Sequence, residues 1–247
     1  MSKHAKPLIL DHCNHKHTSN EVACDLCALY GICRVAGLES DDLEQLDKVV
    51  KRRETVKRGA VLFEEGEPFH AIYAIKSGSF KSSCGSQDKR PRVTAFHFSG
   101  ELIGLDAIQA GHYTYSVTAL EASSICRLEF DQLEQLGEQL PAFQQELIAT
   151  LSGQLSQLQI TALINQQIAN KRLATFLLDL SVRFAEREMP ASTFRLSMSR
   201  SDIGNYLGLA VETISRLFSQ LQEQKVLDVK NRMIEILDPA ALRKIAL

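Results

Sequence analysis

The 247-residue chain has no long hydrophobic run, and its first residues lack the apolar core of a signal peptide. A transmembrane helix needs about 20 mainly apolar residues in succession. The polar beginning MSKHAKPLILDHCNHKH does not offer the shorter apolar stretch that secretion requires. We therefore expect a cytoplasmic protein that has no membrane partner.

The chain also lacks the arrangements that mark common catalytic sites. It contains no phosphate-binding glycine loop and no Ser-His-Asp order, and it places no pair of carboxylates near a predicted pocket. An enzyme that uses a reactive thiol or an iron–sulfur centre remains an alternative, because the chain has six cysteines. The absences nevertheless predict that the protein is not an enzyme.

Charge is nearly balanced overall, at -2, but it is unevenly distributed. Residues 166–247 hold 12 Lys and Arg against 9 Asp and Glu, whereas the rest of the chain holds 16 against 21. A basic C-terminal part on an acidic body is compatible with nucleic-acid binding. A charge imbalance of this size does not by itself establish nucleic-acid binding.

Short apolar runs separated by glycines fill the segment from Arg53 to Phe130. Runs such as AIYAIKSGSFKSS and YSVTALEASSICRLEF alternate or cluster apolar residues over four to eight positions, as strands do. We expect antiparallel strands that pack as a sandwich or jelly roll. The punctuating glycines are Gly59, Gly66, Gly78, Gly85, Gly100 and Gly111.

A long helix is predicted from Phe130 to Gln167, with apolar residues every three or four positions. Such a narrow apolar stripe is typical of a coiled-coil seam. It favours a homodimer interface, although a helix that lies on its own β domain is the alternative. The seam residues after Phe143 are Leu147, Leu151, Leu155, Leu158 and Ala162.

The C-terminal part has the punctuation of a helix-turn-helix. Ser199 and Asp202 have the spacing of an N-cap and its capping-box partner, and Gly208 ends the helix that they begin. A second helix, LAVETISRLFSQLQEQ, follows at once. The segment KVLDVKNRMIEIL then predicts two short strands around KNR, so the whole pattern indicates a winged helix-turn-helix.

The second helix has two distinct faces. The apolar residues Ile214, Leu217, Phe218 and Leu221 share one face. Polar residues with the same spacing share the other: Glu212, Ser215, Arg216 and Ser219.

These polar side chains suit base recognition in the major groove. Arg216 has the two prongs that bond O6 and N7 of guanine, Glu212 accepts from the amine of cytosine, and Ser215 serves several base edges. Thr213 and Ser201 are further candidate DNA contacts. The alternative is a solvated face with a Glu–Arg pair four residues apart, which contributes only a few tenths of a kcal/mol.

Cys24, Cys27 and Cys33 place three thiols within ten residues. A cytoplasmic protein does not normally use such a group as a disulfide framework, so a metal or cluster site is favoured. Spacing alone leaves zinc and iron–sulfur open. It also leaves several fourth ligands open: Cys126, Cys13, Cys84 and nearby histidines.

The sequence resembles the FNR subgroup (fumarate and nitrate reductase regulators) of the CRP/FNR transcription factors. The resemblance runs from about Cys24 to Ile236 and rests on the three clustered cysteines with the distant Cys126, on AFHFSGEL, and on DIGNYLGL followed by VETISR. It implies that Cys24, Cys27, Cys33 and Cys126 hold an oxygen-labile [4Fe–4S] cluster. It also implies that the cluster-bound protein dimerises and binds palindromic DNA with TTGAT-type half-sites, read by the VETISR helix.

The resemblance carries three further expectations. Cyclic-AMP-binding relatives use an arginine to hold the phosphate, but residues 111–117, GHYTYSV, contain none, so we expect no cyclic nucleotide. The loop 85–92 corresponds to one that touches RNA polymerase in the family, although a solvated hairpin tip is equally compatible. Several relatives carry an acid near the position of Leu158, and a leucine there favours a stronger dimer seam.

We therefore predict an α+β protein in four parts. They are a flexible N-terminus with the cluster-binding loop (1–35), a cyclic-nucleotide-binding-like β jelly roll (36–136), a dimerisation helix (137–168) and a winged helix-turn-helix (169–247). The predicted function is an oxygen-responsive global transcriptional activator and repressor. The alternative of the same fold is a zinc-stabilised DNA-binding regulator without redox sensing.

Overall fold

The computed structural model describes residues 50–85, 91–131, 144–145, 147–149, 151–155, 167–186 and 189–247, without the side chains of 50–53. Several predictions fall outside these residues. They concern Cys13, Cys24, Cys27, Cys33, Leu158, Ala162 and most of the loop 85–92.

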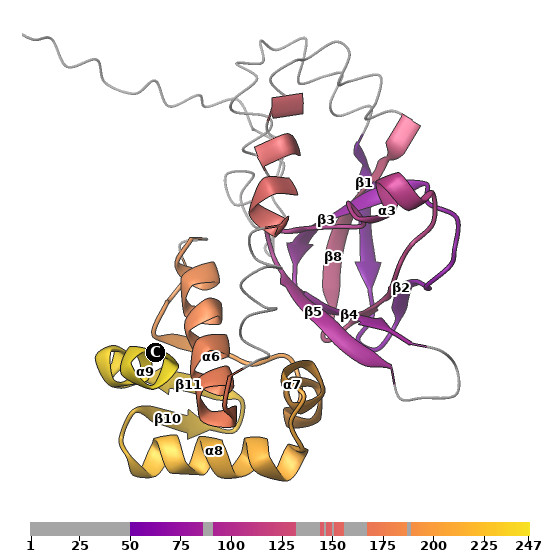
Figure 1. The fold of residues 1–247 in the computed structure, drawn as a ribbon. Helices are drawn as coiled ribbons and strands as arrows, with labels where there is room; N and C mark the ends of the chain where they lie inside the picture. Colours follow the sequence, from indigo (N-terminus) through magenta and orange to yellow (C-terminus); the bar gives the residue numbers. More distant parts are fainter. Residues whose placement is uncertain are drawn as a thin grey trace, which may run out of the picture.

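Two four-stranded antiparallel sheets form the β domain, as the sequence predicts (Figure 1). The first sheet has the order β1 (Val50–Val56), β8 (Ser123–Glu129), β3 (Ala71–Ser77) and β6 (Leu102–Ile103). The second has the order β2 (Val61–Phe63), β7 (Ser116–Ala119), β4 (Ser79–Cys84) and β5 (Arg92–Phe98). A single turn of helix, α3 (Ala107–Ala110), separates β6 from β7.

Alternating side chains from both sheets fill the space between them. Phe80 on β4, Val117 on β7 and Ile125 on β8 are completely buried in this cluster. Gly78 connects β3 to β4 with φ +89°, and a Cβ there would lie 2.2 Å from the Ser123 hydroxyl oxygen. This tight connection therefore requires glycine.

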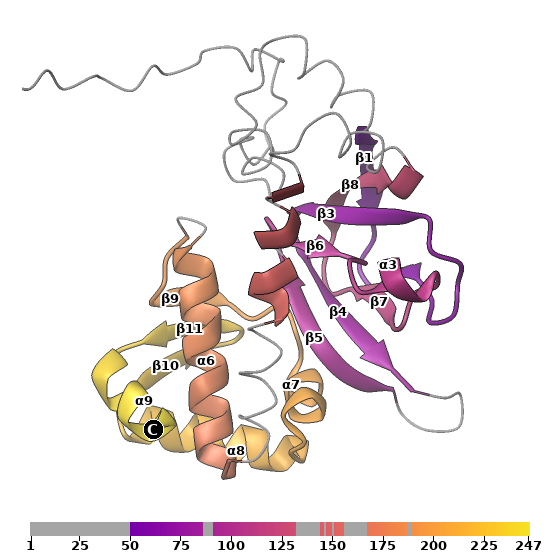
Figure 2. The ribbon, with the colours of Figure 1, turned by 45° about the horizontal axis from the view of Figure 1, so that its top comes forward.

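The described part of the long predicted helix, 144–145, 147–149 and 151–155, is helical and lies beside the first sheet (Figure 2). The side-chain amide of Gln154 donates a 3.2 Å hydrogen bond to the carbonyl oxygen of Leu102 on β6. Apolar side chains on this segment are exposed: Ile148 at 65%, Leu151 at 37% and Leu155 at 60%. Leu147 is partly buried, so the exposed stripe includes Ile148, which the predicted seam omits.

The C-terminal domain contains helices packed on a small antiparallel sheet. Its helices are α6 (Ala169–Ala185), α7 (Arg200–Leu207), α8 (Val211–Glu223) and α9 (Pro239–Ala246). Its strands have the order β10 (Leu227–Lys230), β11 (Met233–Ile236) and β9 (Thr193–Arg195). The predicted winged hairpin is confirmed, and β9 extends it to three strands.

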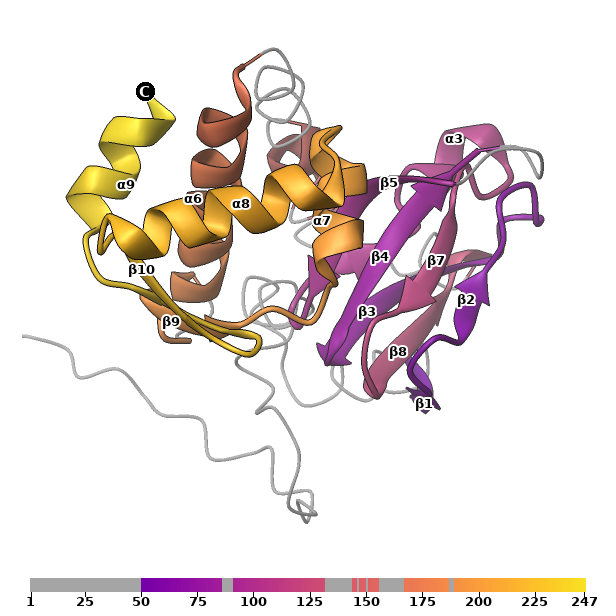
Figure 3. The same ribbon diagram turned by 90° about the horizontal axis from the view of Figure 1, so that it is seen from below.

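The two domains of one protomer share buried apolar surface. Val93, Phe96 and Phe98 on β5 belong to the same buried cluster as Phe176 and Leu177 on α6. Figure 3 shows β5 running past α7 on the side of the β domain that faces the C-terminal domain. Across the described ranges, no helix has the length and apolar character needed to span a membrane.

Candidate nucleic-acid interface

The first helix of the motif, α7, begins and ends as its sequence predicts. The Ser199 hydroxyl accepts from the backbone N–H of Asp202, and the Asp202 carboxylate accepts from the backbone N–H of Ser199, each at 3.0 Å. This reciprocal pair is a capping box. Gly208 follows the helix in the left-handed conformation, with φ 65° and ψ 37°, and turns the chain toward α8.

Gly204 holds α7 against the turn that leads to α8. A Cβ at this position would lie 2.6 Å from the carbonyl oxygen of Leu209, closer than van der Waals contact allows. The Leu209 N–H also donates to the Gly204 carbonyl at 2.8 Å. The sequence pattern does not predict this close approach, because a glycine inside a helical pattern looks the same whether or not another backbone segment packs against it.

The recognition helix α8 has the two faces that its sequence predicts. Its buried residues are Ile214, Leu217, Phe218 and Leu221. Glu212, Ser215 and Arg216 are exposed on the opposite side. In Figure 1, α8 lies along the lower edge of the molecule, away from the β domain.

Hydrogen bonding within α8 determines what the serine hydroxyl presents. The hydroxyl of Ser215 donates to the Val211 carbonyl oxygen at 2.9 Å, so its proton is engaged within the helix and its lone pairs remain for an external donor. In this rotamer Ser215 acts as an acceptor, which matches the amine of cytosine or adenine. Thr213 is partly buried and Ser201 on α7 is exposed, so Ser201 has the more accessible hydroxyl of the two.

Arg200 joins α7 to α8 and was not among the predicted functional residues. Its guanidinium carbon lies 3.2 Å from the centroid of the Phe218 ring. Burial lowers the pKa of Arg200 to about 10. The guanidinium thus remains charged at neutral pH and contributes a cation–π contact between α7 and α8.

The wing presents one exposed lysine at its tip. Lys230 is 80% exposed and forms a 2.7 Å ion pair with Asp228. Asn231 turns the hairpin with φ 60°. Arg232 follows it in the hairpin and donates to the carbonyl oxygen of Ser197 at 3.0 Å, so part of its guanidinium binds the domain itself.

The two described cysteines lie in different surroundings. Cys126 is in β8 opposite Ala74 of β3, and Cys84 ends β4. Both are partly exposed and neither is in a disulfide. The described ranges contain no group of three or more metal-ligating side chains, and the other three predicted ligands lie outside them.

Aromatic rings fill the end of the β domain that contains the stretch 111–117. Tyr113 is buried and stacks on Phe63 with ring centroids 3.8 Å apart, and its hydroxyl donates to the Ala71 carbonyl oxygen at 2.8 Å. Phe69 contacts Tyr113 edge-on at 5.7 Å. Burial raises the pKa of Tyr113, so this hydroxyl remains a neutral donor at physiological pH.

Comparison with known proteins places both domains. Residues 171–245 match the family model described as the Crp-like helix-turn-helix domain, and residues 53–139 match the cyclic nucleotide-binding domain. The solved structure of FixK2 from Bradyrhizobium japonicum has a TM-score of 0.73 and 27% sequence identity. It covers 81% of this chain and 98% of its own.

Curated relatives match nearly the full length. The transcriptional activator protein Anr of Pseudomonas protegens is 38% identical over 228 residues, which is 92% of this chain and 93% of the relative. The fumarate and nitrate reduction regulatory protein of Escherichia coli K12 is 38% identical over 226 residues, covering 91% and 90%. These relatives are regulators rather than enzymes, and the helix-turn-helix implies DNA binding as a dimer. The chain belongs to the CRP/FNR family of transcription regulators, as an FNR-type member.

Proposed function

We propose that this regulator senses oxygen through a [4Fe–4S] cluster held by Cys24, Cys27, Cys33 and Cys126. With the cluster intact, the protein acts as a homodimer in the cytoplasm that activates or represses transcription under anaerobic conditions. The observation that carries the proposal is the position of Cys126, because it is the one proposed ligand within the described residues.

The surroundings of Cys126 fit such a group. The register of β3 and β8 places Ala74 opposite Cys126 and Ile72 opposite Leu128, with these four side chains on one face of the sheet. Ala74, Ile72 and Leu128 are 1–3% exposed. Thiolate ligands suit iron, and an apolar shell limits solvent access to a cluster, which controls its reactivity. A bound cluster supplies a redox-sensitive group whose loss removes the bonds that tie the cysteine loop to β8.

A short row of residues leads from Cys126 toward the proposed dimer helix. Cys126 pairs with Ala74, Ala74 pairs with Leu102, and the Leu102 carbonyl oxygen accepts from Gln154 on that helix. Leu151 and Leu155 on the same segment are exposed. This arrangement supports a dimer interface at Leu147, Leu151, Leu155, Leu158 and Ala162 that responds to the cluster.

The DNA site follows from the exposed face of α8. Glu212, Ser215 and Arg216 are proposed to read TTGAT-type half-sites, with Thr213 and Ser201 as flanking contacts. Exposed positions one turn apart on a helix in the major groove reach neighbouring base pairs. RNA polymerase is the proposed further partner, with the loop 85–92 as a candidate contact.

The filled interior of the β domain supports a sensor that uses no cyclic nucleotide. Phe63 stacks on both Tyr73 and Tyr113 inside this domain, and the stretch 111–117 supplies no arginine for a phosphate. Tyr115 adds a fourth ring beside Phe63.

The test replaces each of the six cysteines with serine and measures iron and acid-labile sulfide in anaerobically purified protein. We expect brown protein that air bleaches, and loss of the cluster in the Cys24, Cys27, Cys33 and Cys126 variants. Cys84→Ser and Cys13→Ser serve as matched controls and should retain it. Full cluster content in Cys126→Ser would contradict the assignment. Colourless wild-type protein that contains zinc would instead establish the zinc-stabilised regulator.

A further inference from the structure

The outer face of β4 and β5 is an interdomain surface. Antiparallel pairing places Phe96 opposite Lys81 and Phe98 opposite Ser79, so these side chains point to one face, whereas Phe80 and His97 point to the other. The inner face fills the β sandwich. The outer face contacts the C-terminal domain, with Phe96 5.2 Å from Tyr206 and Phe98 5.2 Å from Phe184 between ring centroids.

Asn205 on α7 binds the open edge of β5. Among the strands that the structure describes, β5 is the last in its sheet, so one side of its backbone has no described neighbouring strand. The Asn205 carboxamide oxygen accepts from the Val93 N–H at 2.7 Å, and its NH₂ donates to the Pro91 carbonyl oxygen at 3.0 Å. A residue of a parallel strand makes the same two bonds, so the side chain substitutes for a strand at this edge.

A second polar contact lies one turn earlier on α7. Lys81 on β4 donates to Asp202 at 2.5 Å, and the two side chains are 26% and 18% exposed. Asp202 also forms the capping box of α7. Bonds from Lys81 and Ser199 outweigh burial and lower the pKa of Asp202, so the carboxylate stays charged. We call the Asn205 bonds and the Lys81–Asp202 pair the α7 clamp.

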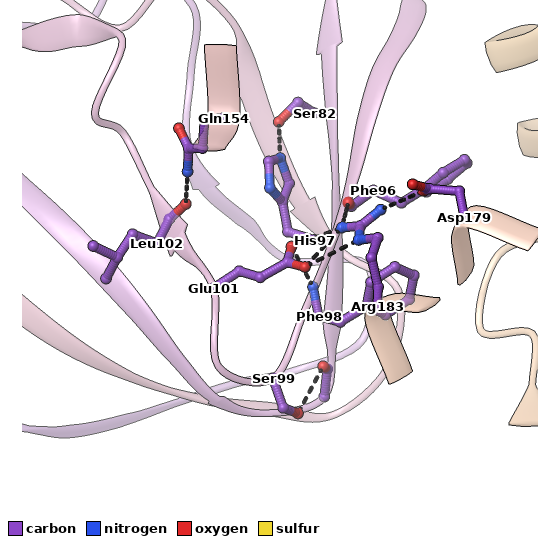
Figure 4. Close-up of polar contacts among 11 residues, drawn as sticks. Ser82, Phe96, His97, Phe98, Ser99, Glu101, Leu102, Gln154, Asp179 and Arg183 are labelled. Carbon is purple, nitrogen blue, oxygen red and sulfur yellow. Dashed lines mark hydrogen bonds and ion pairs between the residues drawn. The ribbon is translucent and has the colours of Figure 1, made fainter. Parts of the chain in front are cut away.

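Arg183 on α6 contacts the same surface through Glu101 and Phe96 (Figure 4). Its guanidinium donates to Glu101 at 2.7 Å and to the Phe96 carbonyl oxygen at 2.6 Å, and it lies 4.7 Å from the centre of the Phe98 ring. With Arg183 at one end and the α7 clamp at the other, the C-terminal domain is held at two separated points. Two such points restrict rotation of this domain against the β domain.

The α7 clamp is linked to α8 through contacts that α7 makes with the turn and with α8 itself. Gly204 packs against the turn at Leu209, and Arg200 lies over Phe218 of α8. These contacts join α7 to α8, so a displacement of α7 at the clamp would carry over to the direction of α8.

We propose that Asn205 and Lys81–Asp202 are positioning residues that set the separation of the two recognition helices, and hence the half-site spacing that the dimer accepts. The inference rests on the proposed binding of a palindrome by a homodimer. Each recognition helix must enter a major groove one helical turn from the other, so a small rotation of either domain changes the spacing that fits. The clamp residues contact no base in this proposal.

The experiment measures binding of full-length anaerobic protein to duplexes with two TTGAT half-sites whose central spacer varies by single base pairs. In Asn205→Ala and in Lys81→Ala, the ratio of the affinity for the best spacer to the affinity for its neighbours should fall by about fivefold. This change corresponds to the loss of about one net hydrogen bond. Lys81→Arg should restore it, because arginine keeps the ion pair with Asp202. Lys244→Ala, an exposed charge loss on α9, is the matched control.

Amide hydrogen exchange in the DNA-free protein provides a second readout. Asn205→Ala should speed exchange at the Val93 N–H, while amides in the centre of α6 remain protected. An unchanged spacing profile in Asn205→Ala, or tighter binding to every spacer, would overturn the inference. If wild-type protein shows no preference for the palindrome over random DNA, the proposed function fails instead, and the two failures are thereby distinguished.

Discussion

At the scale of single residues, we expect the exposed side chains of the C-terminal domain to divide between base recognition and phosphate contact. Arg216 has a guanidinium with paired donors, whereas Lys230 in the wing is a point charge that is 80% exposed. A side chain that reads a base edge affects one position in the DNA site. A side chain that contacts phosphate affects all sequences alike.

We expect Arg216→Ala to cost about 1–3 kcal/mol at the cognate site and to relax the preference at one base pair. Lys230→Ala, as the comparison variant, should weaken all sequences equally and reduce the slope of affinity against salt. Fluorescence anisotropy with cognate, single-mismatch and random duplexes measures both effects. Equal losses for Arg216→Ala on cognate and random DNA would show that it does not read a base.

His97 is a buried residue of the β domain whose charge state affects the stability of the folded protein. Its Nε2 forms a 2.6 Å hydrogen bond with the Ser82 hydroxyl on the inner face. Burial lowers the pKa of His97 from 6.5 to about 4, partly opposed by Glu101 and Asp106 and reinforced by Arg183. The folded protein therefore keeps this ring neutral.

Stability should consequently depend on pH between about 6.5 and 4. The unfolded chain binds the proton first, so the contribution of His97 is complete above pH 6.5 and declines as the pH falls toward 4. The loss is at most about 1.4 kcal/mol per pH unit. Urea unfolding of wild type and His97→Gln at pH 7 and pH 5 tests this, and the difference between the two proteins should shrink at the lower pH. A constant difference would contradict the assignment.

At the scale of elements, the helix-turn-helix depends on a close approach of backbones at Gly204. We expect Gly204→Ala to destabilise the domain by about 1–3 kcal/mol, because the added methyl group overpacks against Leu209 and outweighs the helix propensity of alanine. Gly153 is the matched control, since a Cβ there meets nothing within 4 Å.

Gly153→Ala should stabilise its helix by up to about 1 kcal/mol. Chemical unfolding with each variant separates the two cases, and DNA affinity should fall only for Gly204→Ala. Stabilisation by both substitutions would mean that the turn yields to the methyl group without cost.

The elements themselves differ in how well the sequence predicts them. The strands of the β domain, α7 and α8 have strong local patterns and are confirmed. Strand β9 has only three residues, and it forms because Met233 and Ile234 on β11 pair with it. Helix α9 was also missed, although Asp238 and Pro239 are a recognisable N-cap and first helical residue.

At the scale of the whole molecule, we expect assembly to rest on the exposed apolar residues Ile148, Leu151 and Leu155 and on the rest of the predicted seam. A fully buried leucine contributes about 1.5–3 kcal/mol per chain. The predicted seam from Leu147 to Ala162 contains no charge, and Leu158 adds apolar area to it. We therefore expect cluster-free protein to keep more dimer than is usual for the family, so that part of the switching comes from the orientation of the DNA-binding domains.

Analytical ultracentrifugation of apo and cluster-bound protein tests this expectation. Leu155→Asp and Leu158→Asp should each lower the dimer fraction in both forms. Val182→Asp, an equally apolar and 55% exposed helical position on α6, should leave it unchanged. A strictly monomeric apo protein at micromolar concentration, with no effect of Leu158→Asp, would refute the seam argument.

The sequence by itself determined the features that repeat over short distances. The two faces of α8, the capping box at Ser199 and Asp202, and the alternation in the strands all depend on neighbours within a few residues, so their periodicity shows them directly. The character of the DNA-reading face followed from the same periodicity.

Only the tertiary structure decided how the two domains meet. Asn205 pairs with Val93 across 112 positions, Lys81 with Asp202 across 121, and Arg183 with Glu101 across 82. None of these residues has a local pattern that announces its partner. An asparagine inside a helix or a lysine on a strand resembles any solvated side chain until folding places the edge of β5 or the end of α7 beside it. Their roles arise because packing joins surfaces that the sequence keeps far apart.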